Sequence, residues 1–121
     1  MSNRTPGLIK NYIAEAAIGK HRIVKFGTDD DHVILGAAAT DKLIGVTTEV
    51  PADADERCDV IRSGIAPVYF GGIVAAGDLL TTDANGAAIA TTTASNRIIG
   101  MAEVAGVSGD LGSVCLSPGI I

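Results

Sequence analysis

Aromatic residues are scarce in this chain, which has two Phe, two Tyr and no Trp among 121 residues. A core without aromatic bulk must be filled by Ile, Val and Leu, each of which contributes about 1.5–3 kcal/mol when it is buried. A chain of this length forms one domain, or two small halves fused together. Self-association or a bound partner would add stability to a core this thin.

Basic residues are also few: nine Lys and Arg stand against fourteen Asp and Glu, and the net charge is −5. The basic residues are scattered, so the sequence lacks the positive patch of a phosphate binder, and we expect no nucleic acid partner. No apolar stretch approaches the roughly 18–20 residues that span a bilayer, so we expect no membrane partner. The first twelve residues lack the apolar segment of a signal peptide. We therefore expect the chain to stay in a cytosol-like compartment or in an assembly built there.

Residues that carry chemistry are sparse as well. Cys58 and Cys115 each lie in a strand-like run, which is typical of a small buried hydrophobic residue. His21 and His32 are the only imidazoles, whereas a zinc site uses three or four protein ligands. Residues 29–31 are three consecutive Asp, which we interpret as a solvated hairpin tip, with a loosely bound cation as the alternative. We predict no catalytic residue, no cofactor and no metal site, and hence no enzyme.

What the sequence has in abundance is short β-branched runs between turn residues. This pattern predicts an all-β fold, a small barrel or sandwich of short strands. A helix is indicated only weakly, over residues 11–19, and that segment could equally be an extended arm that runs into a strand. The predicted strands are His21–Phe26, His32–Leu35, Lys42–Thr48, Arg57–Arg62, Ala66–Phe70, Asp78–Thr82, Ala87–Thr91, Arg97–Val104 and Ser113–Ser117.

An internal repeat is visible at an offset of 55 residues. Without a gap, "KLIGVTTEVPADADERCDVIRSGI" (42–65) aligns with "RIIGMAEVAGVSGDLGSVCLSPGI" (97–120). The identical pairs are Ile44/Ile99, Gly45/Gly100, Asp55/Asp110, Gly64/Gly119 and Ile65/Ile120. The offset continues weakly upstream through Ile18/Ile73 and Ile34/Ile89. We interpret this as a duplication, in which the Asp83–Gly86 hairpin turn corresponds to the stretch "GTDDDHVI" of the first half.

Two segments suggest binding. The N-terminal segment is polar but carries Leu8, Ile9 and Tyr12, so we expect it to dock on its own domain or on a neighbour, with a disordered start as the alternative. The stretch 64–77 holds half of the aromatic residues. It is either the central packing layer of the domain or a subunit interface, where Tyr and Phe are enriched.

The cadence of glycine and hydrophobic residues resembles a known family. Ile44-Gly45-Val46, Val60 to Ile65, Gly77 to Asp83 and Ile99-Gly100-Met101-Ala102 are similar to the small head decoration (cement) proteins of tailed bacteriophages, which include a group known only as a domain of unknown function. The resemblance covers residues 17–120.

The resemblance implies a β-rich, β-tulip-like domain over residues 17–121 and an N-terminal arm over residues 1–16. It further implies a minor capsid protein that binds the major capsid protein on the outer surface of the mature head, stabilises that lattice, and self-associates as a homotrimer or a dimer. The capsid-binding arm would then use Thr5, Leu8, Ile9 and Tyr12, and the oligomer interface Val68, Tyr69, Phe70 and Ile73. The alternatives are another virion β domain, of the tail or baseplate, and a small-ligand-binding β-barrel.

Overall fold

The computed structural model describes residues 5–121 of the chain, and the elements it contains over these residues are eleven β-strands. This confirms the all-β prediction, and each of the nine strands expected from sequence overlaps a strand of the structure. The strands are β1 Thr5–Pro6, β2 Ile9–Ala14, β3 Ile23–Phe26, β4 His32–Leu35, β5 Leu43–Thr47, β6 Arg57–Ile61, β7 Gly64–Tyr69, β8 Leu79–Thr82, β9 Ala88–Ala90, β10 Arg97–Ala102 and β11 Leu111–Ile120.

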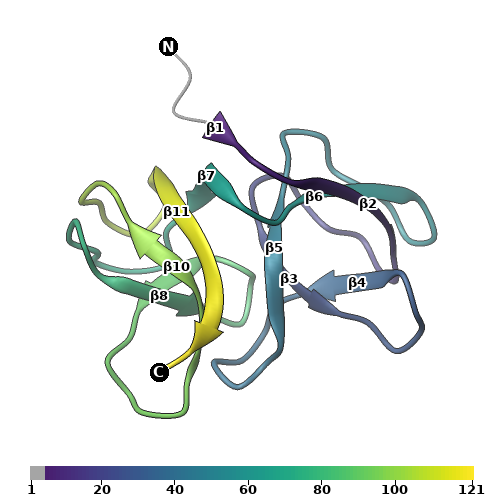
Figure 1. Cartoon of the computed structure of the whole chain (residues 1–121). Coiled ribbons are helices and arrows are strands. Elements are labelled where there is room, and N and C mark those ends of the chain that lie inside the picture. Colours follow the sequence, from purple (N-terminus) through teal and green to yellow (C-terminus); the bar gives the residue numbers. More distant parts are fainter. Residues whose placement is uncertain (1–4) are drawn as a thin grey trace.

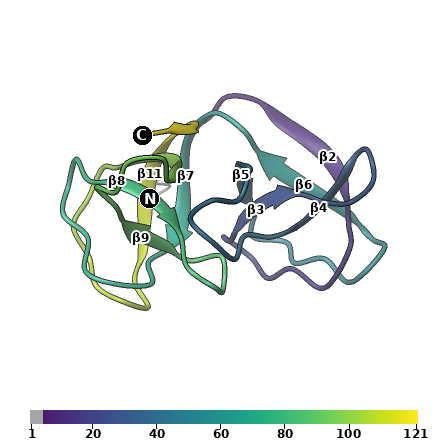
Figure 2. The same cartoon turned by 90° about the horizontal axis from the view of Figure 1, so that it is seen from below.

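The strands form two lobes that lie side by side (Figures 1 and 2). In the first lobe β2–β6 form a closed barrel of order β2-β4-β3-β5-β6. In the second lobe the sheet has the order β1-β7-β11-β10-β8-β9. Closing the first sheet removes its exposed edges, which otherwise invite pairing with other chains.

The two lobes repeat each other at the level of strand register. Each pairing among β2–β6 recurs among β7–β11, including the parallel contact that closes the first barrel. The matching pairs are Ile23↔Val46 with Leu79↔Met101, Val24↔Gly45 with Leu80↔Gly100, Tyr12↔Cys58 with Val68↔Gly112, and Ala14↔Val33 with Phe70↔Ala88. We call residues 9–62 the first repeat and residues 64–121 the second repeat. The internal repeat that the sequence indicates is therefore present in the strand pairing of the structure.

Corresponding positions in the two repeats differ in residue number by 55 for β4 and β5, by 56 for β2 and β3, and by 54 for β6. The ungapped alignment therefore slips by one residue in the acidic turn, where Asp110 corresponds to Glu56 and not to Asp55. The hydrogen bonds confirm this shift, because Asp53 N donates to Glu56 Oε1 at 2.8 Å and Val107 N donates to Asp110 Oδ2 at 3.0 Å. By the same register Ile18 corresponds to Val74 and not to Ile73.

The core is divided into two clusters of buried residues. One cluster fills the first barrel and includes Tyr12, Val24 and Val60. The other fills the second repeat and continues into residues on the outer side of the first barrel, among them Ile23 and Val46. Since β5 packs against β10 and β11, the outer face of the first barrel is the surface that joins the repeats.

The turn at Asp83–Gly86 connects β8 and β9, as the sequence predicted. Asp83 Oδ1 accepts hydrogen bonds from the backbone N–H groups of Asn85 and Ala87, at 2.8 and 2.9 Å. Gly86 has a φ of +73°, a conformation that costs glycine little. The counterpart turn lies between β3 and β4, where Asp31 has a φ of +61°.

The N-terminal segment belongs to both lobes. Thr5 pairs with Ile65 of β7, and from Ile9 onward the chain pairs with β6 as a strand of the first barrel. This revises the expected arm of residues 1–16, because residues 9–14 are part of the barrel and are not a separate extension. It also replaces the weak helix indication over residues 11–19. Residues 1–4 of the expected arm lie outside the described residues.

Candidate binding surface

The outer face of the second repeat carries a continuous apolar row. Leu79, Met101, Cys115 and Ile65 lie opposite one another on four neighbouring strands, β8, β10, β11 and β7. Leu79 is 38% exposed and Met101 is 44% exposed, and the other two side chains are half-buried. Residues that are directly paired across strands point to the same face of a sheet. The row is therefore one strip of apolar surface across the sheet.

A second group of exposed apolar side chains lies on two loops at one end of the second repeat. The loops are joined by the bridge between Val74 and Gly106, whose backbone groups exchange two hydrogen bonds of 2.9 Å. Ile73 beside this bridge is 84% exposed, and Val104 and Val107 of the facing loop are also exposed. We call Ile73, Val104 and Val107 the loop cluster.

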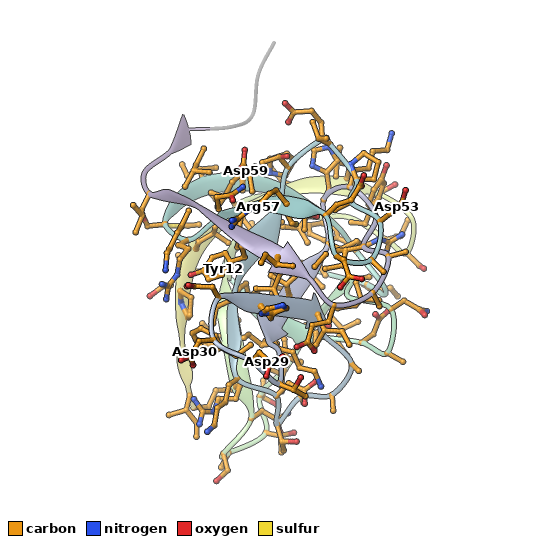
Figure 3. All side chains as sticks on the ribbon, turned by 90° about the vertical axis from the view of Figure 1, so that its right-hand side faces the viewer. Tyr12, Asp29, Asp30, Asp53, Arg57 and Asp59 are labelled. Carbon is orange, nitrogen blue, oxygen red and sulfur yellow. The ribbon has the colours of Figure 1, made fainter. Side chains whose placement is uncertain are left out.

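The surfaces of the two repeats differ in character. Ten of the fourteen acidic residues and eight of the nine basic residues lie in residues 1–62. Eight of the twelve exposed large hydrophobic residues lie in residues 73–121. Figure 3 views the molecule from the side of the first repeat, where Asp29, Asp30, Asp53, Arg57 and Asp59 are spread over the face that points away from the second repeat. Because contiguous exposed apolar surface marks interaction sites, the second repeat is the candidate binding surface.

The residues expected at the oligomer interface are only partly available for one. Val68 and Phe70 are buried in the core of the second repeat, in agreement with the alternative that residues 64–77 form a packing layer. Tyr69 is half-buried at the junction between the repeats, where its ring lies 5.9 Å from that of His21 and 4.9 Å from Arg22 Cζ. Of the four residues, Ile73 alone is exposed.

The residues expected to form a binding arm are tied to the domain. Tyr12 is 2% exposed inside the first barrel, and its hydroxyl accepts a hydrogen bond of 3.2 Å from Arg62 Nη1. Thr5 is a strand residue in β1. Leu8 and Ile9 are exposed at the crossing between the lobes, where Leu8 N donates to Ser63 Oγ and Leu8 O accepts from Arg62 N.

A cluster of potential metal ligands lies beside the acidic hairpin. One ligand atom from each of Glu15, Asp29 and His32 lies within 4.8 Å of the others. Glu15 Oε2 accepts hydrogen bonds from Thr28 Oγ1, Thr28 N and Asp29 N, at 2.8, 2.7 and 3.4 Å. The hydrogen bond from the Thr28 hydroxyl is the main cause that lowers the pKa of Glu15 below its ordinary value of 4.5. The ionised carboxylate of Glu15 thus holds the turn at Thr28 and Asp29 in place.

We predict that Glu15→Gln destabilises the protein at pH 7 and has a smaller effect at pH 3. A carboxyl whose folded-state pKa is depressed contributes stability that is present above pH 4.5 and is lost as the pH falls through the folded-state pKa. Urea unfolding of both proteins at the two pH values measures the difference. An equal loss of stability at both pH values would contradict the assignment of the ionised carboxylate to the turn.

The two cysteines are free, and Cys58 lies in a setting that does not activate its thiol. Cys58 is buried in the first barrel, and burial together with the nearby Asp59 raises the pKa of its thiol. A raised pKa leaves less thiolate, which is the reactive form. Cys115 is half-buried within the apolar row.

The sequence patterns assign no binding role to Leu79, Met101, Val104 or Val107. The charge distribution does indicate a binding surface in the second half of the chain. That half has five charged residues against eighteen in the first half, while it keeps its hydrophobic residues. Such a charge-poor half must cover its apolar side chains with its own core or with a partner.

The repeat structure and these surfaces define a small all-β protein with one charged side and one apolar side. The family model "Phage cement protein" matches residues 5–116, and the chain belongs to this family. The chain is thus a structural protein of the phage virion head, as the resemblance predicted.

The structure is similar to the N base of the head fibre protein gp8.5 of bacteriophage phi29, with a TM-score of 0.72, 20% sequence identity, and coverage of 94% of this chain and 97% of that chain. At this identity the likeness concerns the fold. No curated protein matches the sequence. Among residues 5–121, no helix has the length and hydrophobicity to cross a membrane.

Proposed function

We propose that this protein binds the outer surface of the mature phage head and stabilises the lattice of the major capsid protein. The observation that carries the proposal is the division of the surface between the repeats. The apolar second repeat faces the shell, where Met101 and Leu79 become buried, and the charged first repeat faces solvent. Copies arrayed by the symmetry of the head gain avidity, so weak individual contacts suffice.

Binding only the mature lattice stabilises that lattice by mass action, because the protein has no affinity for the disassembled state. The outward face carries several acidic groups, including Asp29, Asp30 and Asp53 (Figure 3). A net negative exterior keeps decorated heads soluble and reduces non-specific contact with nucleic acid.

The proposal includes self-association, with a homotrimer favoured over a dimer. The loop cluster of Ile73, Val104 and Val107 is the surface we assign to it, since these exposed side chains lie together at one end of the second repeat. In this arrangement the exposed side chains of Leu8 and Ile9 contact the capsid protein at the crossing between the lobes. Native mass spectrometry of the purified chain distinguishes a trimer or dimer from a monomer.

We predict that Met101→Glu weakens binding to heads at least about tenfold. The substitution places an unpaired charge within an apolar interface, a change that costs more than the 1.4 kcal/mol equivalent to a factor of ten. The measurement is co-sedimentation with heads of the source phage that lack this protein, followed by heating to compare head rupture.

The matched control is Val50→Glu, which adds the same charge at an exposed apolar residue of the first repeat. It should bind and protect heads as the unaltered protein does. If the unaltered protein fails to bind or to protect heads, the proposed function is wrong. If Val50→Glu is the variant that loses binding, the assignment of the second repeat to the shell is wrong.

A further inference from the structure

An open groove lies on the second repeat between β8 and the end of β9. It has a volume of about 610 Å³ and is lined by Gly77, Asp78, Leu79, Ala90, Thr91 and Ile121, among others. Leu79 belongs to both this groove and the apolar row. The groove is therefore part of the surface that the proposed function turns towards the shell.

The first repeat contains the same groove in a filled form. By strand register, Leu79 corresponds to Ile23 and Ala90 corresponds to Leu35. The backbone agrees, because Thr91 N donates to Leu79 O at 2.9 Å just as Gly36 N donates to Ile23 O at 2.9 Å.

The occupant of the first groove is the turn of the β8–β9 hairpin. Ile23 N donates a hydrogen bond of 2.8 Å to Gly86 O in this turn. The turn approaches so closely that a Cβ added at Gly86 would lie 2.5 Å from Leu35 Cδ1. The groove of the repeat is thus built to receive a tight turn that offers a backbone carbonyl.

The two repeats are packed front to back, which means that the surfaces in contact are not corresponding surfaces of the two repeats. In a twofold arrangement corresponding residues would face each other, so Leu79 and Met101 would be buried like Ile23 and Val46. The latter two are fully buried at the junction, whereas Leu79 and Met101 are exposed. Front-to-back packing leaves one groove open at the end of the pair, where it is accessible to a turn from outside the chain.

Charge decides which kind of turn fits. In the first repeat, Arg22 of the groove and Asp83 of the turn line the same cavity, so a basic residue of the groove lies at the same cavity as an acidic residue of the turn. The counterpart of Arg22 in the second groove is Asp78. The corresponding turn of a second copy would be residues 28–31, which carries three Asp. Like charges would face each other, and this disfavours a second copy as the occupant.

We propose that the groove of the second repeat binds the turn of a β-hairpin of the head shell protein, a turn that carries Lys or Arg opposite Asp78. The inference rests on the proposed function and adds which part of the shell protein the groove recognises. The partner's turn takes the place that Asp83–Gly86 takes in the first repeat, with its carbonyl towards Leu79 and its basic side chain towards the Asp78 carboxylate.

The test places the photo-crosslinking residue p-benzoylphenylalanine at Thr92, an exposed residue of the groove, with Val50 as the control position. Each labelled protein is bound to heads that lack the natural protein and is irradiated. We expect an adduct of the Thr92 variant with the shell protein, mapped by mass spectrometry to a turn with a basic residue, and no adduct at Val50. An adduct with a second copy, or no adduct while the protein is bound, would overturn this inference alone. Failure of the unaltered protein to bind heads would overturn the proposed function and the inference with it.

The charge is tested by Asp78→Asn, which keeps the oxygen that accepts the Ala75 N–H at 2.9 Å. An exposed ion pair contributes about 0.2–1 kcal/mol, so binding to heads should weaken by up to about fivefold and depend less on salt. The control is Asp110→Asn, which removes a carboxylate with the same turn-capping role away from the groove. Equal binding of both variants would overturn the assignment of a basic residue opposite Asp78.

Discussion

Gly45→Val and Gly100→Val are each expected to destabilise the protein by at least about 3 kcal/mol, the upper end of the usual cost of overpacking. A Cβ at Gly45 would collide with the carbonyl oxygen of Ile61, and one at Gly100 with the carbonyl oxygen of Cys115. Both obstacles are strand backbone, which cannot move aside without breaking the sheet. A loss of this size is a large part of the 5–15 kcal/mol that holds a typical domain together.

The measurement is thermal or urea unfolding of both variants beside Gly72→Ala. At Gly72 an added Cβ would meet its nearest neighbour, Ile89 Cγ2, at 3.7 Å, which is an ordinary contact. This control should remain close to the unaltered protein. A stable Gly100→Val beside an unfolded Gly45→Val would contradict the structural equivalence of the two repeats at this position.

Deletion of residues 2–12 is expected to unfold the first barrel, whereas deletion of residues 2–8 leaves it folded. The longer deletion removes most of β2, which pairs with both β4 and β6 and closes the barrel. It also removes Tyr12, and loss of a buried aromatic side chain alone costs about 3–5 kcal/mol. The shorter deletion removes β1 and the hydrogen bonds of Gly7 and Leu8 to Ser63.

Circular dichroism and a thermal melt of the two truncated chains distinguish these outcomes. If residues 1–16 formed a separate arm, as the resemblance implies, removal of residues 2–12 would leave the domain intact. A cooperative melt near that of the full chain for the longer deletion would restore that expectation and contradict the role of β2 in closing the barrel. The shorter deletion then tests, on heads, the proposed contact by Leu8.

The strands and the internal repeat could be predicted because local sequence patterns indicate both. Turns such as Asp83–Gly86 separate short β-branched runs, and Ile44-Gly45 and Ile99-Gly100 preserve the register of β5 and β10. The strand β2 could not be predicted with the same certainty. Its sequence contains Lys and Ala and continues into Glu15 and Ala16, all of which favour helix. Its strand form depends on pairing with β6, about fifty residues away.

The candidate surface was harder to predict for a related reason. In a closed β structure a side chain is buried or exposed according to which way the strand faces, and a shift by one residue exchanges the two. Val68 and Phe70 point into the second repeat, whereas Met101 and Leu79 point out of it. Hydrophobicity is similar in both sets, so the sequence alone did not separate core residues from binding residues.

The measurement that tests the account most directly is a cryo-electron microscopy map of heads decorated with this protein. The account predicts density in which the second repeat, with Leu79 and Met101, contacts the shell, and in which the hairpin of Asp29 to Asp31 points to solvent. A map with the charged first repeat on the shell and the second repeat outward would contradict it.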